Sequence, residues 1–396
     1  MKKYNIFRNI ALGALVVSSL SSCEDYLSLS NPNKTTVETF WTDLKDTKSG
    51  LYATYAALRN DYVLNIREEA WRSDLCWPGY GRPQPQNNAE GWNWYCQNYT
   101  NSTVAISSKW DALYISIWRA NQVIEALERI KDTASGDEIE TWNIQMGHAR
   151  FIRGLMYFYL HSSFNNGSVV LRTSTAQSFN LPLSPAEDVL KFFREDLEVA
   201  YDLLPVPQDV TSDYEGLATK GTAATIQGIS YLYEKEYSEA EMKFKDVIDN
   251  YGYELEQDWT KMFTNAGEFN SESILEISYS LDYRQDITTW DMNCMYNRLA
   301  TLSTSLGGFL PAAWLVNEFL NDKPDNKDSR NTGRQVSLRA SAMVALVKDE
   351  VTPYYINGNA SEKCPMGGPL ADWGFGKFKK YTNHDICLLY TSDAAD

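Results

Sequence analysis

The chain has 396 residues, of which 43% are hydrophobic and 13% aromatic, and this composition can fill the core of one large domain or two interleaved ones. Its 52 acidic residues outnumber 36 Lys and Arg residues, which gives a formal net charge of −16. That charge argues against nucleic acid and anionic lipid as ligands, because both require clustered Lys and Arg. We therefore expect a globular protein with an acidic surface.

Residues 1–22 have the organisation of a secretory signal. Lys2, Lys3 and Arg8 form a basic leader, and an apolar run follows at residues 10–17. Crossing a hydrocarbon core ~30 Å thick takes about 20 helical residues, so this run is too short for a membrane span. Residues 1–22 are therefore predicted to be removed on export.

The leader ends in the sequence LSSC at residues 20–23, which resembles the lipobox of bacterial lipoproteins. In a lipobox the signal peptidase cuts before the cysteine, which then receives a diacylglycerol thioether and an N-acyl chain. The resemblance implies lipid attachment at Cys23, and several acyl chains anchor durably where one chain is marginal. Glu24 and Asp25 resemble the acidic export signal of surface lipoproteins in Bacteroidetes. The alternative is an ordinary signal peptide with an incidental cysteine.

Helical periodicity dominates the rest of the chain. Between residues 109 and 130, apolar side chains recur every three or four positions, which predicts a helix with one buried face. Residues 142–164 are apolar nearly all round, which is typical of an interior helix. A further helix is predicted at 186–204, ended by Pro205 and Pro207.

Residues 220–250 are predicted to form a helical hairpin that matches half of the tetratricopeptide signature. The matching positions are Gly228, Tyr231, Ala240 and Phe244. In that repeat, small residues let two antiparallel helices approach while aromatic residues fill the groove between them. Ala224 and Gln227 depart from the signature, whereas Gly154 and Tyr157 repeat its first half. About two degenerate repeats are expected, with the helix at 109–130 as a candidate third.

Two segments do not fit a repeat. Aromatic residues are concentrated between residues 60 and 108 among Pro, Gly and Asn, which indicates loops. The segment at 273–280 is short, β-branched and aromatic, which predicts a strand.

Cysteine and histidine residues give no sign of a catalytic or metal centre. Cys76 and Cys96 could pair in an oxidising compartment, and two unpaired buried thiols fit the sequence equally well. His148 and His161 lie on predicted helices, where packing is the simpler role. No metalloprotease, nucleophile-elbow or phosphate-loop motif is present. We therefore predict no catalytic residue and no cofactor.

The loop with Asp322, Asp325 and Asp328 could suggest calcium through its oxygen ligands. The EF-hand spacing and its twelfth-position Glu are missing, so a solvated loop is the preferred interpretation. No metal site is predicted.

An ordered series of motifs resembles the SusD/RagB family, the surface glycan-binding lipoproteins of Bacteroidetes. The series covers residues 15–280 and consists of the lipobox, Phe40-Trp41, Trp110 to Asn121, Ala149 to Leu160, Asp196 to Pro205, Ala218 to Ala224 and Ser271 to Ile277. No single motif is decisive, but their order and spacing are fairly specific.

The resemblance implies a mostly α fold of tetratricopeptide-like helical repeats, with a loop-rich insertion subdomain and a few short strands. The domain would span residues 23–386, with helical scaffold at 40–60, 108–131, 142–164, 186–204 and 219–251. The ligand region would comprise 61–107 and 280–386. The family captures oligosaccharides at the outer membrane and delivers them to a TonB-dependent, SusC-like transporter, without chemistry of its own.

The sequence departs from its relatives in two places. Many relatives carry a Phe-Gly-x-Val-Pro-Leu turn where this chain has Phe164 to Leu171, so the loop there is expected to differ. Relatives also continue well past residue 385, which favours a truncated C-terminus. Residues 387–396 look like a translated sequencing adapter and are excluded from the fold.

Candidate glycan-binding residues are chosen by the chemistry of sugars. Pyranose rings bind stacked on Trp or Tyr, with a few amide, Arg or carboxylate groups contacting the hydroxyls. The candidates are Asp74, Trp77, Arg82, Trp92, Trp94, Tyr95 and Asn98, with Trp290 and Tyr296 as the second side. For each aromatic residue the alternative is a place in the core under long loops.

Two other functions remain open. A glycoside hydrolase needs two carboxylates about 5 to 9 Å apart, and Glu68, Glu69 and Asp74 are the nearest candidates. A surface scaffold would bind protein or peptide on a concave helical face. Converging exposed aromatics in the Trp-rich segment would favour glycan, whereas exposed aromatics along the helices would favour the scaffold.

Overall fold

The computed structural model of the protein describes residues 40–79, 89–178, 180–257, 269–277, 310–334, 337, 344–345 and 377–378. The predicted signal, the lipid-attachment residue Cys23 and the tail at 387–396 lie outside these ranges. Within them, no helix combines the length and the apolar character needed to cross a membrane.

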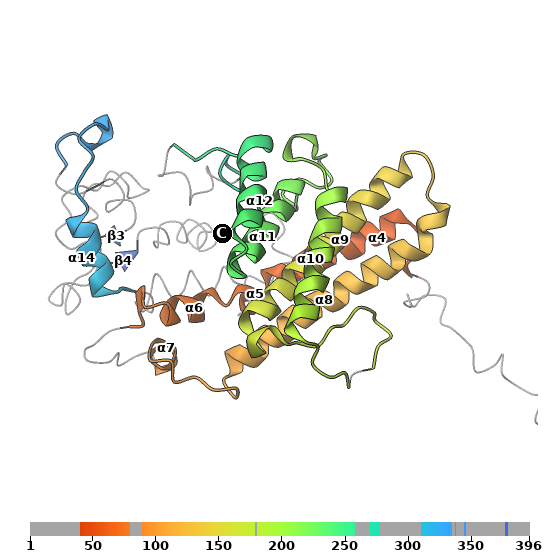
Figure 1. The fold of residues 1–396 in the computed structure, drawn as a ribbon, viewed down its shortest axis with the longest axis horizontal. Coiled ribbons are helices and arrows are strands. Elements are labelled where there is room, and N and C mark those ends of the chain that lie inside the picture. Colours follow the sequence, from red (N-terminus) through yellow and green to blue (C-terminus); the bar gives the residue numbers. More distant parts are fainter. Residues whose placement is uncertain are drawn as a thin grey trace, which may run out of the picture.

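Six helices form the scaffold, and Figure 1 shows the longest of them side by side. They are α4 (Leu44–Ala56), α8 (Val104–Ile130), α9 (Glu138–Ser163), α10 (Ala186–Leu203), α11 (Lys220–Tyr233) and α12 (Tyr237–Asn250). Each of the helices predicted from periodicity is confirmed, with boundaries shifted by a few residues. α9 packs against α4, α8 and α10, while α11 pairs with α12.

α9 is the interior helix that its composition predicts. Phe151, Met156 and Leu160 are fully buried in the main core cluster, together with side chains from α8 and α10. A Cβ added at Gly154 would lie 3.1 Å from Leu197 Cγ, so the absence of a side chain there lets α10 approach closely. Dense packing of this kind makes the core sensitive to small volume changes.

The α11–α12 hairpin confirms the tetratricopeptide-like reading. A Cβ on Gly228 would lie 2.6 Å from Cε1 of Phe244, so the phenyl ring occupies the space that glycine leaves open. α11 begins with a capping box, in which the Thr219 hydroxyl accepts the Thr222 backbone N–H and the Thr222 hydroxyl accepts that of Thr219.

A buried ionic network joins three helices. The Arg153 guanidinium on α9 donates to Asp196 on α10 at 2.7 and 2.8 Å, and to Oδ1 of Asn121 on α8 at 2.8 Å. Arg150 donates to the same carboxylate at 3.0 Å. The Asn121 amide in turn donates to the backbone oxygen of Arg172 at 2.9 Å, which fixes the loop after α9.

Short helices and 3-10 turns make up the rest of the described helical structure. They are the helices α5 (Asp61–Leu64), α6 (Ile66–Arg72), α7 (Ala89–Tyr95) and α14 (Ala313–Asn321) and the 3-10 turns at Ala57–Arg59, Lys131–Thr133, Asn165–Gly167, Pro207–Asp209 and Ser329–Asn331. The turn at Asn165–Gly167 lies in the loop that was expected to differ from the relatives.

Two minimal antiparallel ladders are described. β1 (Cys76–Trp77) pairs with β2 (Leu310–Pro311), and β3 (Val344–Ala345) pairs with β4 (Lys377–Phe378). The strand expected at 273–280 is wrong for its described part, because residues 273–277 form bends and coil. There the apolar side chains pack on helices, and the backbone oxygen of Ile274 accepts a hydrogen bond from the Thr222 hydroxyl at 2.9 Å.

Candidate functional site

Three half-buried aromatic side chains meet where β1 lies beside α7. Neighbouring strand residues point to opposite faces, and here Cys76 is buried while Trp77 is partly exposed. Trp92 and Tyr95 are three residues apart on α7, which places them on one face of the helix. We call Trp77, Trp92 and Tyr95 the aromatic trio.

The rings of the trio contact one another in two geometries. Trp92 and Tyr95 lie 5.8 Å apart between centroids and 18° from parallel. Trp77 meets both edge-on, at 5.7 Å from Trp92 and 5.3 Å from Tyr95. Offset and edge-to-face pairs are the favoured aromatic contacts, so the trio is a pre-arranged aromatic surface on elements that the sequence had indicated only as loop.

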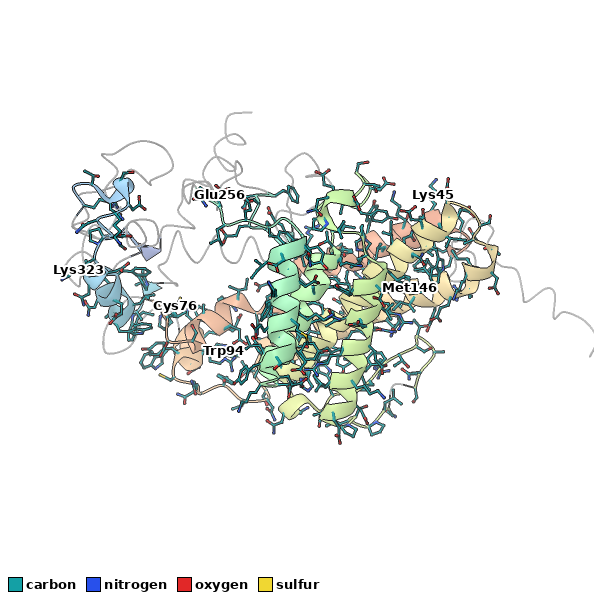
Figure 2. All side chains as sticks on the ribbon, turned by 45° about the horizontal axis from the view of Figure 1, so that its top comes forward. Lys45, Cys76, Trp94, Met146, Glu256 and Lys323 are labelled. Carbon is teal, nitrogen blue, oxygen red and sulfur yellow. The ribbon has the colours of Figure 1, made fainter. Side chains whose placement is uncertain are left out.

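Trp94 belongs to the packing beneath the trio. It is 4% exposed, clusters with Trp71 and Cys76, and stacks on Tyr99 with centroids 4.3 Å apart. Figure 2 shows Cys76 and Trp94 at the same end of the molecule, away from Met146 in the helical bundle. For Trp94 the structure therefore favours the core alternative.

Two of the polar candidates lie at the surface near the trio. Asp74 is exposed with a left-handed backbone (φ 61°), two residues before β1. Asn98 is exposed after α7, where its backbone N–H donates to the Asn93 oxygen at 2.7 Å. The remaining candidates, Arg82, Trp290 and Tyr296, lie outside the described residues.

Trp314 is an aromatic residue next to Asp74 that the sequence analysis did not select. Its indole N–H donates to the Asp74 backbone oxygen at 3.1 Å, and its side chain is 47% exposed. The two residues are 240 positions apart, and the β1–β2 ladder brings them together. The available signal was a large aromatic residue in the first turn of a short apolar helix.

A charged layer lies below the aromatic residues. Arg67 donates to Glu68 Oε1 at 2.8 Å through Nε and to Glu90 at 3.1 Å, and its guanidinium lies over Trp71. Glu68 is fully buried, and this desolvation raises the pKa of its carboxyl above the usual range. Glu69 pairs with Arg72, so both glutamates named as hydrolase candidates are held in ion pairs.

The two nearby cysteines are free thiols, Cys76 buried and Cys96 exposed. Burial raises the pKa of the Cys76 thiol to about 12, so it stays protonated and unreactive at neutral pH. The part of the chain that the structure describes contains no group of three or more His, Cys, Asp or Glu residues suited to a metal ion.

Comparison with known proteins identifies the family of this chain. The family model described as "Starch-binding associating with outer membrane" (SusD-like) matches residues 25–228, which is more than half of the chain. The chain belongs to the SusD-like family. The match confirms the family inferred from the ordered motifs, and it spans the trio, the helices from α4 to α10 and the first part of α11.

Two curated SusD-like relatives show the range of similarity. The chain is 28% identical over 309 residues to the SusD-like protein P38 of Formosa agariphila, which covers 72% of this chain and 56% of that protein. It is 27% identical over 206 residues to a SusD-like protein of Bacteroides ovatus, which covers 48% and 36%. This SusD-like chain thus spans about half of the first relative's length and about a third of the second's.

Solved structures confirm the mostly helical SusD-like fold. A SusD superfamily protein from Bacteroides vulgatus superposes with a TM-score of 0.64 at 21% identity, covering 87% of this chain and 69% of that one. A laminarin-binding SusD-like protein superposes with a TM-score of 0.53 at 24% identity, covering 60% and 52%.

Proposed function

We propose that this SusD-like chain binds oligosaccharide or polysaccharide on the aromatic trio and delivers it to a TonB-dependent, SusC-like transporter. The carrying observation is the cluster of three half-buried rings with exposed Asp74 beside it. Pyranose rings present apolar C–H faces that stack on such rings, and a hydroxyl rim that needs a few polar anchors. Laminarin binding by one structural relative supports the same ligand class.

One hydrogen-bond donor and one acceptor near the trio suit sugar hydroxyls. Among the described residues, the buried Trp77 indole N–H has no hydrogen-bond partner, whereas a buried indole N–H normally finds one. A shift of a neighbouring side chain on binding would expose this N–H to a ligand hydroxyl. The exposed carboxylate of Asp74 accepts hydrogen bonds strongly because it is charged. Trp314, oriented by its bond to Asp74, extends the aromatic surface on one side.

A lipid on Cys23 would hold the protein at the outer face of the outer membrane. Tethering raises the local concentration of a weak binder beside its partner. The outer surface of α8 supports a protein partner, since Ile115 and Trp118 are 50% and 51% exposed there. Exposed aromatic residues on a helix also fit the scaffold alternative, in which the helices alone bind protein or peptide.

The test is affinity electrophoresis of the chain from Glu24 onward through gels that contain a panel of polysaccharides. Trp92→Ala and Tyr95→Ala should each weaken retardation about tenfold, equivalent to ~1.4 kcal/mol, by removing a stacking ring. Tyr237→Ala is the matched control, because Tyr237 is 65% exposed on α12. Retardation by none of the polysaccharides, or equal loss in all three variants, would contradict glycan binding at the trio.

A further inference from the structure

Away from the trio, a pocket lies on the helical scaffold, where α9 and α11 end beside α10. Its volume is about 400 Å³, within the range of small-molecule sites. The lining residues are Phe158, His161, Ser162, Asn166, Phe193, Ser230, Tyr233 and Glu234. We call it the α9–α11 pocket. None of its residues belongs to the aromatic trio or to the elements that carry the trio.

The floor and one wall of the pocket are aromatic. Phe158 and Phe193 are buried and meet edge-on, with centroids 5.9 Å apart. Tyr233 stands over Phe158 at 5.6 Å and is 62% exposed. An exposed ring backed by buried rings keeps its orientation while one face stays open to a ligand.

The rim carries neutral hydrogen-bonding groups. Burial is the main cause that lowers the pKa of His161, so its imidazole is uncharged at neutral pH. A hydrogen bond to the Ala186 backbone engages one ring nitrogen and leaves the other as an acceptor. The Ser162 hydroxyl donates to the Phe158 backbone oxygen at 2.8 Å and can still accept. Asn166 is exposed in a left-handed turn (φ 52°).

The charge of the pocket selects against anions. Arg194, whose charge acts on His161, is held by Glu236 at 3.0 Å and by the Ser230 hydroxyl at 3.2 Å. Glu234 has no ion-pair partner among the described residues, so its carboxylate faces the pocket rim uncompensated. An anionic ligand would be repelled, whereas hydroxyl groups can donate to this carboxylate.

We propose that the α9–α11 pocket is a second carbohydrate site, which takes one neutral pyranose unit stacked on Tyr233. The stacking face, the neutral imidazole and the lone carboxylate together suit a polyhydroxylated ring without acidic groups. The proposal shares its ligand class with the proposed function but rests on different residues. A glycan bound at the trio could therefore be held at a second point on the scaffold, which would raise its residence time.

The test is saturation-transfer NMR of the chain from Glu24 onward with glucose, galactose, mannose, N-acetylglucosamine and galacturonate. At least one neutral sugar should receive saturation, and galacturonate should receive none. Tyr233→Ala and the pocket-filling Ser162→Phe should each reduce that saturation at least fivefold. Tyr237→Ala should leave it unchanged.

Trp92→Ala separates the two sites. It should weaken polysaccharide retardation about tenfold, while the neutral sugar keeps its saturation through Tyr233. The second site is overturned if no neutral sugar is saturated, if saturation survives both Tyr233→Ala and Ser162→Phe, or if it disappears in Trp92→Ala. Polysaccharide retardation tests glycan binding at the trio, and saturation of the neutral sugar tests the α9–α11 pocket. Either proposal can therefore be contradicted while the other stands.

Discussion

His148 is a buried histidine whose environment keeps it neutral. The Tyr55 hydroxyl accepts the Ala218 backbone N–H at 3.1 Å and donates to His148 Nδ1 at 2.8 Å. The imidazole stacks on Tyr214, and its Nε2 has no hydrogen-bond partner in the described part of the chain. Burial lowers the pKa of His148 to about 3, because no neighbouring charge compensates the imidazolium.

This residue should make the protein less stable in acid. Since the folded pKa lies below the unfolded value of about 6.5, the unfolded chain binds the proton more readily as pH falls from 6.5 toward 3. Stability present at pH 7 is therefore lost in this window, at ~1.4 kcal/mol per pH unit. Urea unfolding at pH 7 and pH 5 should show a loss smaller by ~2 kcal/mol in His148→Leu than in the unmodified chain.

His161→Leu is the control for that comparison, because His161 is only partly buried and should carry less of the pH dependence. An equal acid loss in His148→Leu and the unmodified chain would show that His148 does not carry the effect.

The sequence showed that the Trp-rich segment contains side chains suited to sugars, but it could not show which of these side chains are exposed. Trp92 and Trp94 are two positions apart, and only the short helix α7 turns one to the surface and the other into the core. The helix was not predicted, because the Pro, Gly and Asn residues around it are typical of loops. Trp314 could not be assigned because its contact with Asp74 depends on the fold of the intervening 240 residues.

At the scale of elements, the α11–α12 hairpin was predicted from spacing and then observed. Small and aromatic residues at fixed offsets determine which helix faces touch, so local sequence was sufficient. At 273–277 local sequence misled, because a short apolar run fits a strand or a surface that packs on helices. Here the second case holds, because Leu275 and Ile277 pack against the main core, which is formed by residues distant in sequence.

The contact between Gly228 and Phe244 gives a quantitative prediction. Gly228→Ala places a methyl group 2.6 Å from Phe244 Cε1, which is closer than two carbon atoms can pack. Overpacking should destabilise the protein by about 1–2 kcal/mol, although alanine is the better helix former by about 1 kcal/mol. The measurement is the free energy of unfolding in urea.

A double-mutant cycle isolates the cause. Phe244→Ala should create space for the new methyl group, so Gly228→Ala should cost at least ~1 kcal/mol less in that background. Additive effects of the two changes would mean that the helices do not meet at this pair.

At the scale of the whole molecule, the fold class followed from the sequence because long periodic helices form most of the described chain. The arrangement of those helices depends on buried polar contacts that periodicity does not reveal. Arg153 and Asp196 looked like family motif positions, and the structure shows that they join α9 to α10 with Asn121 of α8 attached.

Removing the acidic partner of this network should lower the stability of the fold strongly. Asp196→Ala leaves the Arg153 guanidinium, which is 3% exposed, without its counter-ion and should destabilise the protein by about 3–5 kcal/mol. Glu128→Ala is the matched control, because its carboxylate lies 3.6 Å from Arg150 and is 56% exposed. Exposed pairs of this kind contribute about 0–1 kcal/mol. Similar thermal midpoints for both variants would refute the assignment.

The two-residue ladder between β1 and β2 has a consequence for the order in which the protein folds. The helices form from contacts that are local in sequence, whereas the ladder and the bond from Trp314 to Asp74 close a loop of 240 residues. Closing so long a loop is entropically costly until the intervening chain is compact. We therefore expect the backing of the aromatic trio to be among the last parts to form, so that a nascent chain acquires its helical scaffold before this aromatic surface.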